Sequence, residues 1–322
     1  MRLAISLALL IGTLIGVASP QQPEITAEQS LVWIYKQDLG GRRFDKALGF
    51  VIAPGQVATA FQAIDEAARL EIKFADGRQA TSRDIIACNR LQDWALIKVD
   101  TGRTPALPKI ESGAERYSAF NVDADGTRTI SQINVTGRRT IPGFGERIQI
   151  QPAPSRDAVG GPLLTQNNLA AGIVGGSVTP GNRIPAEPVN EATPIAAIPS
   201  TVAGRPATLQ TLLDSGVLTP PTVPNPSLIS AELTKTSDKL AWVHTVWQKK
   251  SRAGNGEVTV KVYDVRNRLL VDRTPQKISL TETTPLRVPF EFSLQKFTAG
   301  VYRIDVFWND QPVWRTFLTL TD

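Results

Sequence analysis

Hydrophobic and polar positions alternate in short runs along this 322-residue chain, and such runs predict strands rather than helices. In the first third of the chain the runs end at turn residues such as Pro54-Gly55 and Asp76-Gly77. The clearest runs cover residues 30–35, 48–53, 56–60, 70–74 and 94–99. Their spacing of roughly eight to twelve residues is typical of a β-sandwich or β-barrel.

A second set of runs follows a segment rich in proline and glycine at residues 101–108. These runs cover residues 116–122, 127–136, 147–151, 162–165, 169–174 and 193–198. One helix is predicted at residues 207–213, where Leu209, Leu212 and Leu213 share a face and Gly216 follows the end. Two sets of strands followed by a helix favour paired β-barrels.

A proline-rich stretch separates these two sets from the last third of the chain. Four of the seven residues at 220–226 are proline, which predicts an extended linker at 219–226. Alternating runs then occupy residues 228–233, 240–247, 257–264, 269–272, 286–294, 301–308 and 313–320. This pattern predicts an immunoglobulin-like sandwich at 227–322, with Tyr302 as a corner tyrosine.

The first residues have the pattern of an export signal. Arg2 precedes an uncharged, mostly apolar run at 3–18, and small residues such as Ala18 and Ser19 follow where a signal peptidase would cut. We therefore expect a signal peptide at 1–19, a lead-in at 20–30 and a periplasmic or secreted protein. The alternative is an uncleaved membrane anchor, but the run is shorter than the roughly 20 apolar residues that span a bilayer.

Composition narrows the function classes. With 42% hydrophobic and 20% charged residues the chain is globular, and its net charge of +5 is scattered rather than gathered into one basic face. Nucleic-acid binding is therefore not expected. The chain has one histidine, His244, and one cysteine, Cys88, so an intramolecular disulfide is excluded, and neither a metal site nor a cofactor is expected. Cys88 lies in an apolar run and is predicted to be buried and inert.

Several segments occur in the order found in a known enzyme family. They cover residues 49–53, 57–64, 70–77, 93–99, 160–164, 172–174 and 197–200. Over residues 31–218 the chain resembles the trypsin-like serine proteases, and among them the bacterial envelope proteases of the high-temperature-requirement (Deg) type. The resemblance implies an all-β architecture, a trypsin-like double β-barrel followed by the immunoglobulin-like β-sandwich. The peptide-binding PDZ module of that family is not recognisable after the linker, and the oligomeric state stays open.

The resemblance places the catalytic histidine of the family at Gln62, the orienting aspartate at Asp93 and the nucleophilic serine at Val159. Acyl transfer by this route needs a hydroxyl nucleophile and a base that takes and returns its proton. Valine has no hydroxyl, and a glutamine amide cannot exchange protons in this way. The lone histidine, His244, lies beyond the linker. We expect the Gln62 side-chain amide to donate a hydrogen bond to Asp93, in a structural role.

The oxyanion-hole positions also depart from the family. They correspond to Asp157 and Val159, and Asp157 replaces a glycine. A carboxylate about 4 Å from a developing oxyanion would oppose it by roughly 4 kcal/mol at an effective dielectric constant near 20. Other hydroxyls at Ser155, Ser177 and Thr179 have no base beside them in the sequence. A serine–lysine pair stays open, although Lys98 is expected to point outward.

Three functions follow from these observations. The first is a pseudoprotease that binds a protein or peptide by strand addition without cutting it. The groove candidates for this role are Gly172, Val174, Gly175, Gly176 and Ser177. The second is a serine-type hydrolase with an unorthodox active site. The third is a structural or adhesive envelope protein that acts through its C-terminal sandwich.

Overall fold

The computed structural model describes residues 26–110, 116–175, 190–202, 204–250 and 254–320, and within them the protein is built almost entirely of strands. One α-helix, α1 (Leu209–Asp214), and four 3-10 turns complete the described part. The turns are η1 (Ala27–Ser30), η2 (Phe61–Ala63), η3 (Arg156–Ala158) and η4 (Ile195–Ala197). The predicted all-β class is confirmed. The predicted signal peptide lies outside the described residues, and no helix in the described ranges is long and apolar enough to cross a membrane.

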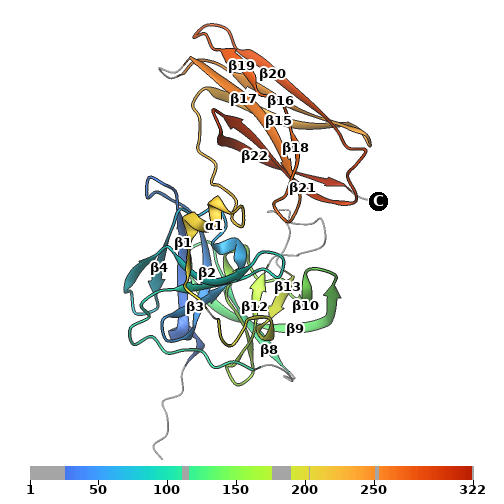
Figure 1. Ribbon diagram of the computed structural model, residues 1–322. Helices are drawn as coiled ribbons and strands as arrows, with labels where there is room; N and C mark the ends of the chain where they lie inside the picture. The colour runs from blue at the N-terminus through green and yellow to red at the C-terminus, as the bar shows by residue number, and fades with distance from the viewer. Residues whose placement is uncertain (1–25, 111–115, 176–189, 203, 251–253, 321–322) are drawn as a thin grey trace, which may run out of the picture.

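The first unit is an eight-stranded sheet that curves into a half-barrel, in the order β14-β6-β7-β3-β2-β1-β4-β5 (Figure 1). Its strands are β1 (Leu31–Gln37), β2 (Arg43–Ala53), β3 (Gln56–Thr59), β4 (Arg69–Phe74), β5 (Gln79–Ser82), β6 (Asp84–Asn89), β7 (Trp94–Lys98) and β14 (Ala207–Thr208). Apolar side chains such as Ile34, Phe61 and Ile72 fill its interior. The sequence pattern did not predict β5 or β6. β5 is a short polar edge strand, and only one of its residues is buried.

The second unit is a closed barrel in the order β10-β13-β12-β11-β8-β9. Its strands are β8 (Tyr117–Val122), β9 (Arg128–Ile141), β10 (Gly145–Gln151), β11 (Pro162–Thr165), β12 (Ala170–Gly175) and β13 (Glu191–Pro194). One apolar core joins the barrels, because Leu48 and Phe50 of β2 pack in the same buried cluster as Leu163 and Ile173. The two barrels therefore share an apolar interface, in addition to the separate core of the half-barrel.

The chain then returns to the half-barrel before it enters the last unit. β14 pairs with β6, and α1 follows at once with the Thr208 hydroxyl accepting a hydrogen bond from the Thr211 N–H. Leu209 is fully buried, while Leu212 and Leu213 pack against the half-barrel core. The predicted apolar face of this helix is confirmed, and Gly216 follows with a φ of +72°, as expected after a helix end.

The last unit is a sandwich of two antiparallel sheets. One has the order β15-β16-β20, and the other β18-β17-β21-β22 with β19 paired to β17. The strands are β15 (Leu228–Ser237), β16 (Leu240–Trp247), β17 (Asn255–Tyr263), β18 (Leu269–Asp272), β19 (Gln276–Ser279), β20 (Leu286–Ser293), β21 (Gly300–Trp308) and β22 (Gln311–Leu320). The Tyr302 hydroxyl donates to the Thr298 carbonyl at 2.7 Å, so the predicted corner tyrosine is confirmed.

Buried charges hold the sandwich against the half-barrel. Asp305 in β21 is fully buried and pairs with Arg303 at 3.0 Å and Arg315 at 2.6 Å. Arg315 also reaches Glu66 in the half-barrel at 2.7 Å. Burial lowers the pKa of Arg303, whereas for Arg315 the hydrogen bonds and charge of Asp305 outweigh burial and raise the pKa. Both guanidinium groups stay charged, since an arginine loses its proton only far above neutral pH.

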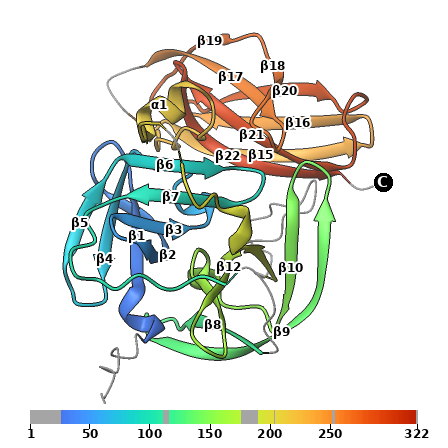
Figure 2. The ribbon, with the colours of Figure 1, turned by 60° about the horizontal axis from the view of Figure 1, so that its bottom comes forward.

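A second layer of polar contacts extends this junction, which Figure 2 shows beside β6 and α1. Arg90 pairs with Asp65 at 3.2 Å and donates to the Thr219 hydroxyl at 3.0 Å and to the Val265 carbonyl at 3.3 Å. The Thr219 N–H donates to Asp65 at 2.7 Å. The Val223 N–H, inside the proline-rich segment, donates to the Pro312 carbonyl at 2.8 Å. The segment is therefore tied to both units.

Candidate functional site

The loop that carries Val159 begins as a 3-10 turn and ends as a tight β-turn. The Val159 N–H donates to the Arg156 carbonyl at 3.2 Å, and the Gly161 N–H donates to the Ala158 carbonyl at 3.0 Å. Val159 has φ −56° and ψ 135°, and Gly160 has φ +87°. These values describe a type II turn, which requires a residue tolerant of positive φ at its third position. The backbone conformation at position 160 therefore requires glycine.

Hydrogen bonds join this loop to both barrels. The Leu48 N–H of β2 donates to the Val159 carbonyl at 2.8 Å, and the Gly160 N–H donates to the Val174 carbonyl of β12 at 2.7 Å. A Cβ at Gly160 would lie 2.1 Å from the Leu48 carbonyl oxygen and 2.3 Å from the Thr59 hydroxyl. Gly160 is therefore required by the packing between the two barrels, whether or not the loop carries a nucleophile.

Val159 itself is part of the apolar core. Its side chain belongs to the buried cluster shared by the two barrels, and the residue is 6% exposed. Its N–H, the oxyanion-hole equivalent, already donates within the loop. An oxyanion hole needs donors aimed at the place where charge develops. The main chain at Val159 therefore lacks a donor free for that purpose.

Asp93 and Gln62 are neighbours, but their contact differs from the predicted one. The main-chain N–H of Gln62 donates to Asp93 Oδ1 at 3.3 Å, whereas the buried side-chain Nε2 of Gln62 makes no hydrogen bond with the described residues. The prediction that the side-chain amide holds Asp93 was therefore wrong. The 3-10 turn η2 already presents the N–H of Gln62, and the amide has no part in the contact.

Asp93 is 1% exposed and has a φ of +54°. This left-handed conformation is uncommon for residues other than glycine, although aspartate tolerates it better than most. A Cβ at Gly175 would lie 2.8 Å from Asp93 Oδ2, so the carboxylate needs a glycine at this point of β12. The structure keeps the carboxylate in place and brings it against the second barrel.

Asp157 does not face an oxyanion. Its carboxylate pairs with Lys46 at 2.7 Å on the half-exposed rim of the loop, and Lys46 lies 5.0 Å from the centre of the Trp33 ring. The ammonium group offsets the repulsion predicted for this carboxylate. Asp157 thus links the Val159 loop to β2.

The predicted strand-addition groove falls mostly inside the closed barrel. Gly172 pairs with Leu163 of β11 and with Pro194 of β13, and Val174 pairs with Ala192. The Val174 N–H and carbonyl are also bound to the Val159 loop. A strand with partners on both sides has no main-chain groups left for a third, so the prediction was wrong for Gly172 and Val174.

The remaining groove candidates lie at the end of this strand. Gly175 is buried and pairs with Glu191. Gly176, Ser177 and Thr179 lie outside the described residues.

The alternative nucleophile and base positions have other roles. The Ser155 hydroxyl accepts a hydrogen bond from the Val122 N–H at 2.8 Å, which fixes the loop to β8. Lys98 is exposed, as predicted. Lys36 Nζ donates to the carbonyl of Gln62 at 3.2 Å and pairs with Asp45 at 2.8 Å. Neither the Lys36 nor the Lys98 ammonium group makes a hydrogen bond to a serine hydroxyl of the described residues.

Metal ligands and thiol chemistry have no support at this site. Among the described residues, no three His, Cys, Asp or Glu side chains gather closely enough to hold a metal ion. Burial, together with the charge of Asp65, raises the pKa of the Cys88 thiol to about 11, so this thiol stays protonated at neutral pH.

Comparison with known proteins shows no family membership. The chain matches no protein-family model and no curated protein. Among solved structures it is similar to the serine endoprotease from Yersinia pestis, at 18% identity and a TM-score of 0.43 over 54% of this chain and 64% of that one.

Two further structures give similar values. The HtrA-type protease AlgW, solved with a decapeptide, is 17% identical at a TM-score of 0.42, over 53% of this chain and 62% of that one. Deg5 is 21% identical at a TM-score of 0.41, over 53% and 85%. The chain thus spans less than two thirds of the first and second of these three proteins. The half-barrel, the closed barrel and the β-sandwich are described from the structure of this chain itself.

Proposed function

We propose that this chain is a non-catalytic, trypsin-like-domain protein of the cell envelope that binds protein or peptide without cutting it. The observation that carries the proposal is the buried Val159, whose side chain belongs to the core and whose N–H is bound within its own loop. Gln62 adds no base, since its amide cannot exchange protons at neutral pH. The barrels nevertheless keep the loop, the Asp93 carboxylate and the glycines that place them.

The catalytic half of the proposal is tested with a fluorophosphonate probe and with Gln62→His/Val159→Ser. We expect no labelling of the wild-type chain. We also expect none of the double variant, because the N–H of residue 159 donates to the Arg156 carbonyl and leaves the oxyanion without that donor. Trypsin serves as the positive control. Stoichiometric labelling of a wild-type serine would instead support the unorthodox hydrolase.

The binding half is tested at the end of β12. Strand addition depends on main-chain N–H groups, and the predicted groove positions Gly176 and Ser177, outside the described residues, are tested directly. Ser177→Pro removes one N–H, whereas Ser177→Ala keeps it and serves as the control. With fluorescein-labelled β-casein as an unfolded ligand, we expect anisotropy to show binding lost only in the proline variant. No binding by the wild-type chain would contradict the proposal.

A second candidate function rests on the sandwich. Trp242 and His244 stack at 5.8 Å on β16, with ring planes 6° apart, and His244 is exposed. The facing positions on β15 and β20 carry Glu232 and Glu291. An aromatic pair flanked by carboxylates suits an adhesive contact. Loss of casein binding in Trp242→Ala, with Ser177→Pro unaffected, would favour this second function.

A further inference from the structure

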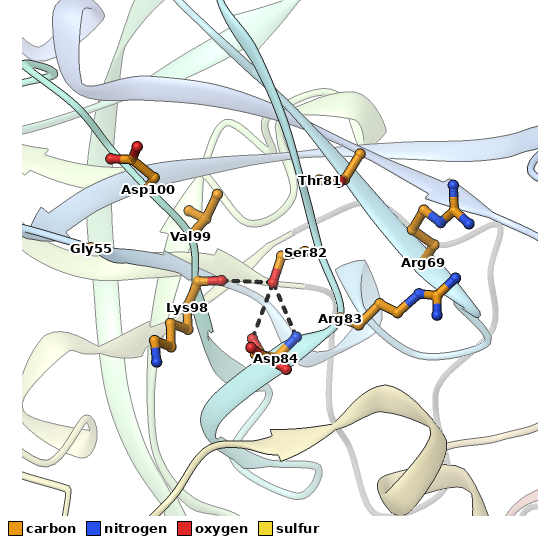
Figure 3. A pocket seen from close by; sticks show the side chains of 9 residues that line it. All are labelled: Gly55, Arg69, Thr81, Ser82, Arg83, Asp84, Lys98, Val99 and Asp100. Carbon is orange, nitrogen blue, oxygen red and sulfur yellow. Dashed lines mark hydrogen bonds between the residues drawn. The ribbon is translucent and has the colours of Figure 1, made fainter.

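A cavity of about 780 Å³ opens on the half-barrel, and none of the triad-equivalent residues lines it. Figure 3 shows two arginine side chains, Arg69 and Arg83, extending on the same side of this cavity. Its other charged lining residues are Lys98, Asp84 and Asp100. The cavity thus combines three cationic side chains with two carboxylates.

The two arginines lie at the ends of paired strands. Arg69 begins β4, and Arg83 directly follows β5, whose last residue Ser82 pairs with Leu70. Like charges that lie close together repel each other. Neither guanidinium group makes a hydrogen bond or ion pair with a described residue. No described carboxylate therefore lies within ion-pair distance of either guanidinium group, although Asp84 and Asp100 line the same cavity.

The backbone beneath Arg83 is held firmly. The Ser82 hydroxyl donates to the Lys98 carbonyl at 2.6 Å and accepts from the Asp84 N–H at 3.0 Å, as the dashed lines in Figure 3 mark. On the other side, the Leu209 N–H donates to the Arg83 carbonyl at 2.8 Å. Strand β7 and the start of α1 thus fix the segment that carries Arg83, so a ligand would meet an ordered backbone.

We propose that Arg69 and Arg83 bind the phosphate group of a phosphomonoester in this cavity. Guanidinium groups present paired N–H donors that match the oxygens of phosphate. A carboxylate has two oxygens and is occupied by one such fork, whereas a tetrahedral phosphate has oxygens for both arginines. With Lys98 the three cations outnumber the two carboxylates of the cavity, so the negative charge of the phosphate offsets an excess of positive charge. The cavity volume leaves room for the rest of the ester beside Lys98 and Thr81.

Calorimetry with inorganic phosphate and glycerol 3-phosphate tests this site on the full chain. We expect both to bind the wild type, and Arg69→Ala or Arg83→Ala to weaken binding about tenfold each, the loss expected for one hydrogen-bonded charged partner. Arg287→Ala, an exposed arginine on the sandwich, removes the same charge and should leave the affinity unchanged. Arg69→Lys/Arg83→Lys keeps both positive charges but loses the paired N–H donors of the guanidinium groups. We expect this variant to bind phosphate weakly.

One further variant and a vesicle assay complete the design. Asp84→Asn removes a carboxylate from the cavity wall and should tighten phosphate binding. Cosedimentation with phosphatidylcholine vesicles, with and without phosphatidic acid, separates a lipid headgroup from a soluble ester. Binding of either source that depends on the two arginines supports the site. Equal phosphate affinity in the wild type and in both single variants, Arg69→Ala and Arg83→Ala, or no phosphate binding by the wild type, would overturn it.

Discussion

The Val159 loop and the junction between the half-barrel and the sandwich treat polar groups in opposite ways. Around Val159, apolar side chains such as Leu48 and Ala158 pack at the position that the resemblance assigns to a nucleophile. At the junction with the sandwich, Asp305 is fully buried between two arginines. The barrel interface as a whole does bury charge, since Arg147 is 1% exposed and donates to the Gln92 carbonyl at 2.9 Å.

This difference shows that the free-energy cost of burying a group depends on its hydrogen-bond and charge partners. A buried charge is tolerated when it is paired and hydrogen-bonded, and it costs several kcal/mol when it is not. Asp305 has two arginine partners, so it is retained by pairing. The Val159 side chain has no polar atom to satisfy, so it is stabilised by apolar packing. The stability of the Asp305 cluster is therefore sensitive to the loss of one charged partner. The stability around Val159 is sensitive to the size and shape of the packed side chains.

The largest expected effect is at the junction. Asp305→Asn keeps the side-chain size but leaves Arg303 and Arg315 without their shared carboxylate. We expect the free energy of unfolding to fall by about 3 to 5 kcal/mol, the cost of breaking a buried ion pair from one side. Urea denaturation measures this change.

The control for this substitution is Asp238→Asn. Asp238 pairs with Lys235 at 2.7 Å, but its side chain is 95% exposed. Surface pairs contribute at most about 1 kcal/mol, so this variant should unfold almost as the wild type does. Equal losses in the two variants would show that the buried cluster does not stabilise the junction.

The next effect concerns shape at the barrel interface. Gly160 and Gly77 have nearly equal φ values of +87° and +86°, yet a Cβ at Gly160 would strike Leu48 and Thr59, whereas a Cβ at Gly77 would meet nothing within 4 Å. We expect Gly160→Ala to lower the free energy of unfolding by about 3 kcal/mol and Gly77→Ala by about 1 kcal/mol. Urea denaturation compares the two, and a smaller loss at 160 would contradict the packing described.

The smallest expected effect is a pH dependence of the free energy of unfolding. It arises from Cys88, whose pKa depends on the junction residues Asp65 and Arg90. Burial first, and then the charge of Asp65, raises the pKa of Cys88 from its ordinary value of 9.0 to about 11, while Arg90 lowers it. Folding therefore disfavours the thiolate. This contribution to stability is fully present below pH 9 and is lost as the pH rises from 9 toward 11.

Alkylation of Cys88 by iodoacetamide follows this pKa directly. In Arg90→Gln we expect the pKa to rise further, because a nearby cation is lost, whereas Arg90→Lys keeps the charge and should change it less. Stability measured against a Cys88→Ala reference should fall by at most about 1.4 kcal/mol per pH unit in this window. Rapid alkylation at neutral pH would show that the thiol is not buried as described.

Strand content was readable from the sequence because alternation and turn residues are local signals. β16 and β18 begin and end where the pattern predicted, and the corner tyrosine was found from its place near Gly300. β5 and β19 were missed, since short edge strands with mostly exposed residues carry little alternation. β9 extends to Ile141 because its partner β10 continues the ladder, which no local pattern reveals.

The sequence alone determined which chemical groups the candidate site contains: valine and glutamine stand at two of the three positions that the resemblance assigns to a catalytic triad, and the lone histidine lies in the other unit. Because the residue types do not depend on the fold, this conclusion followed from the sequence alone. Only the tertiary structure decided how those groups are placed. It bound Asp93 to a main-chain N–H, paired Asp157 with Lys46, and brought Arg69 and Arg83 to one cavity. Such contacts depend on register and on segments far apart in the chain, which a linear pattern does not encode.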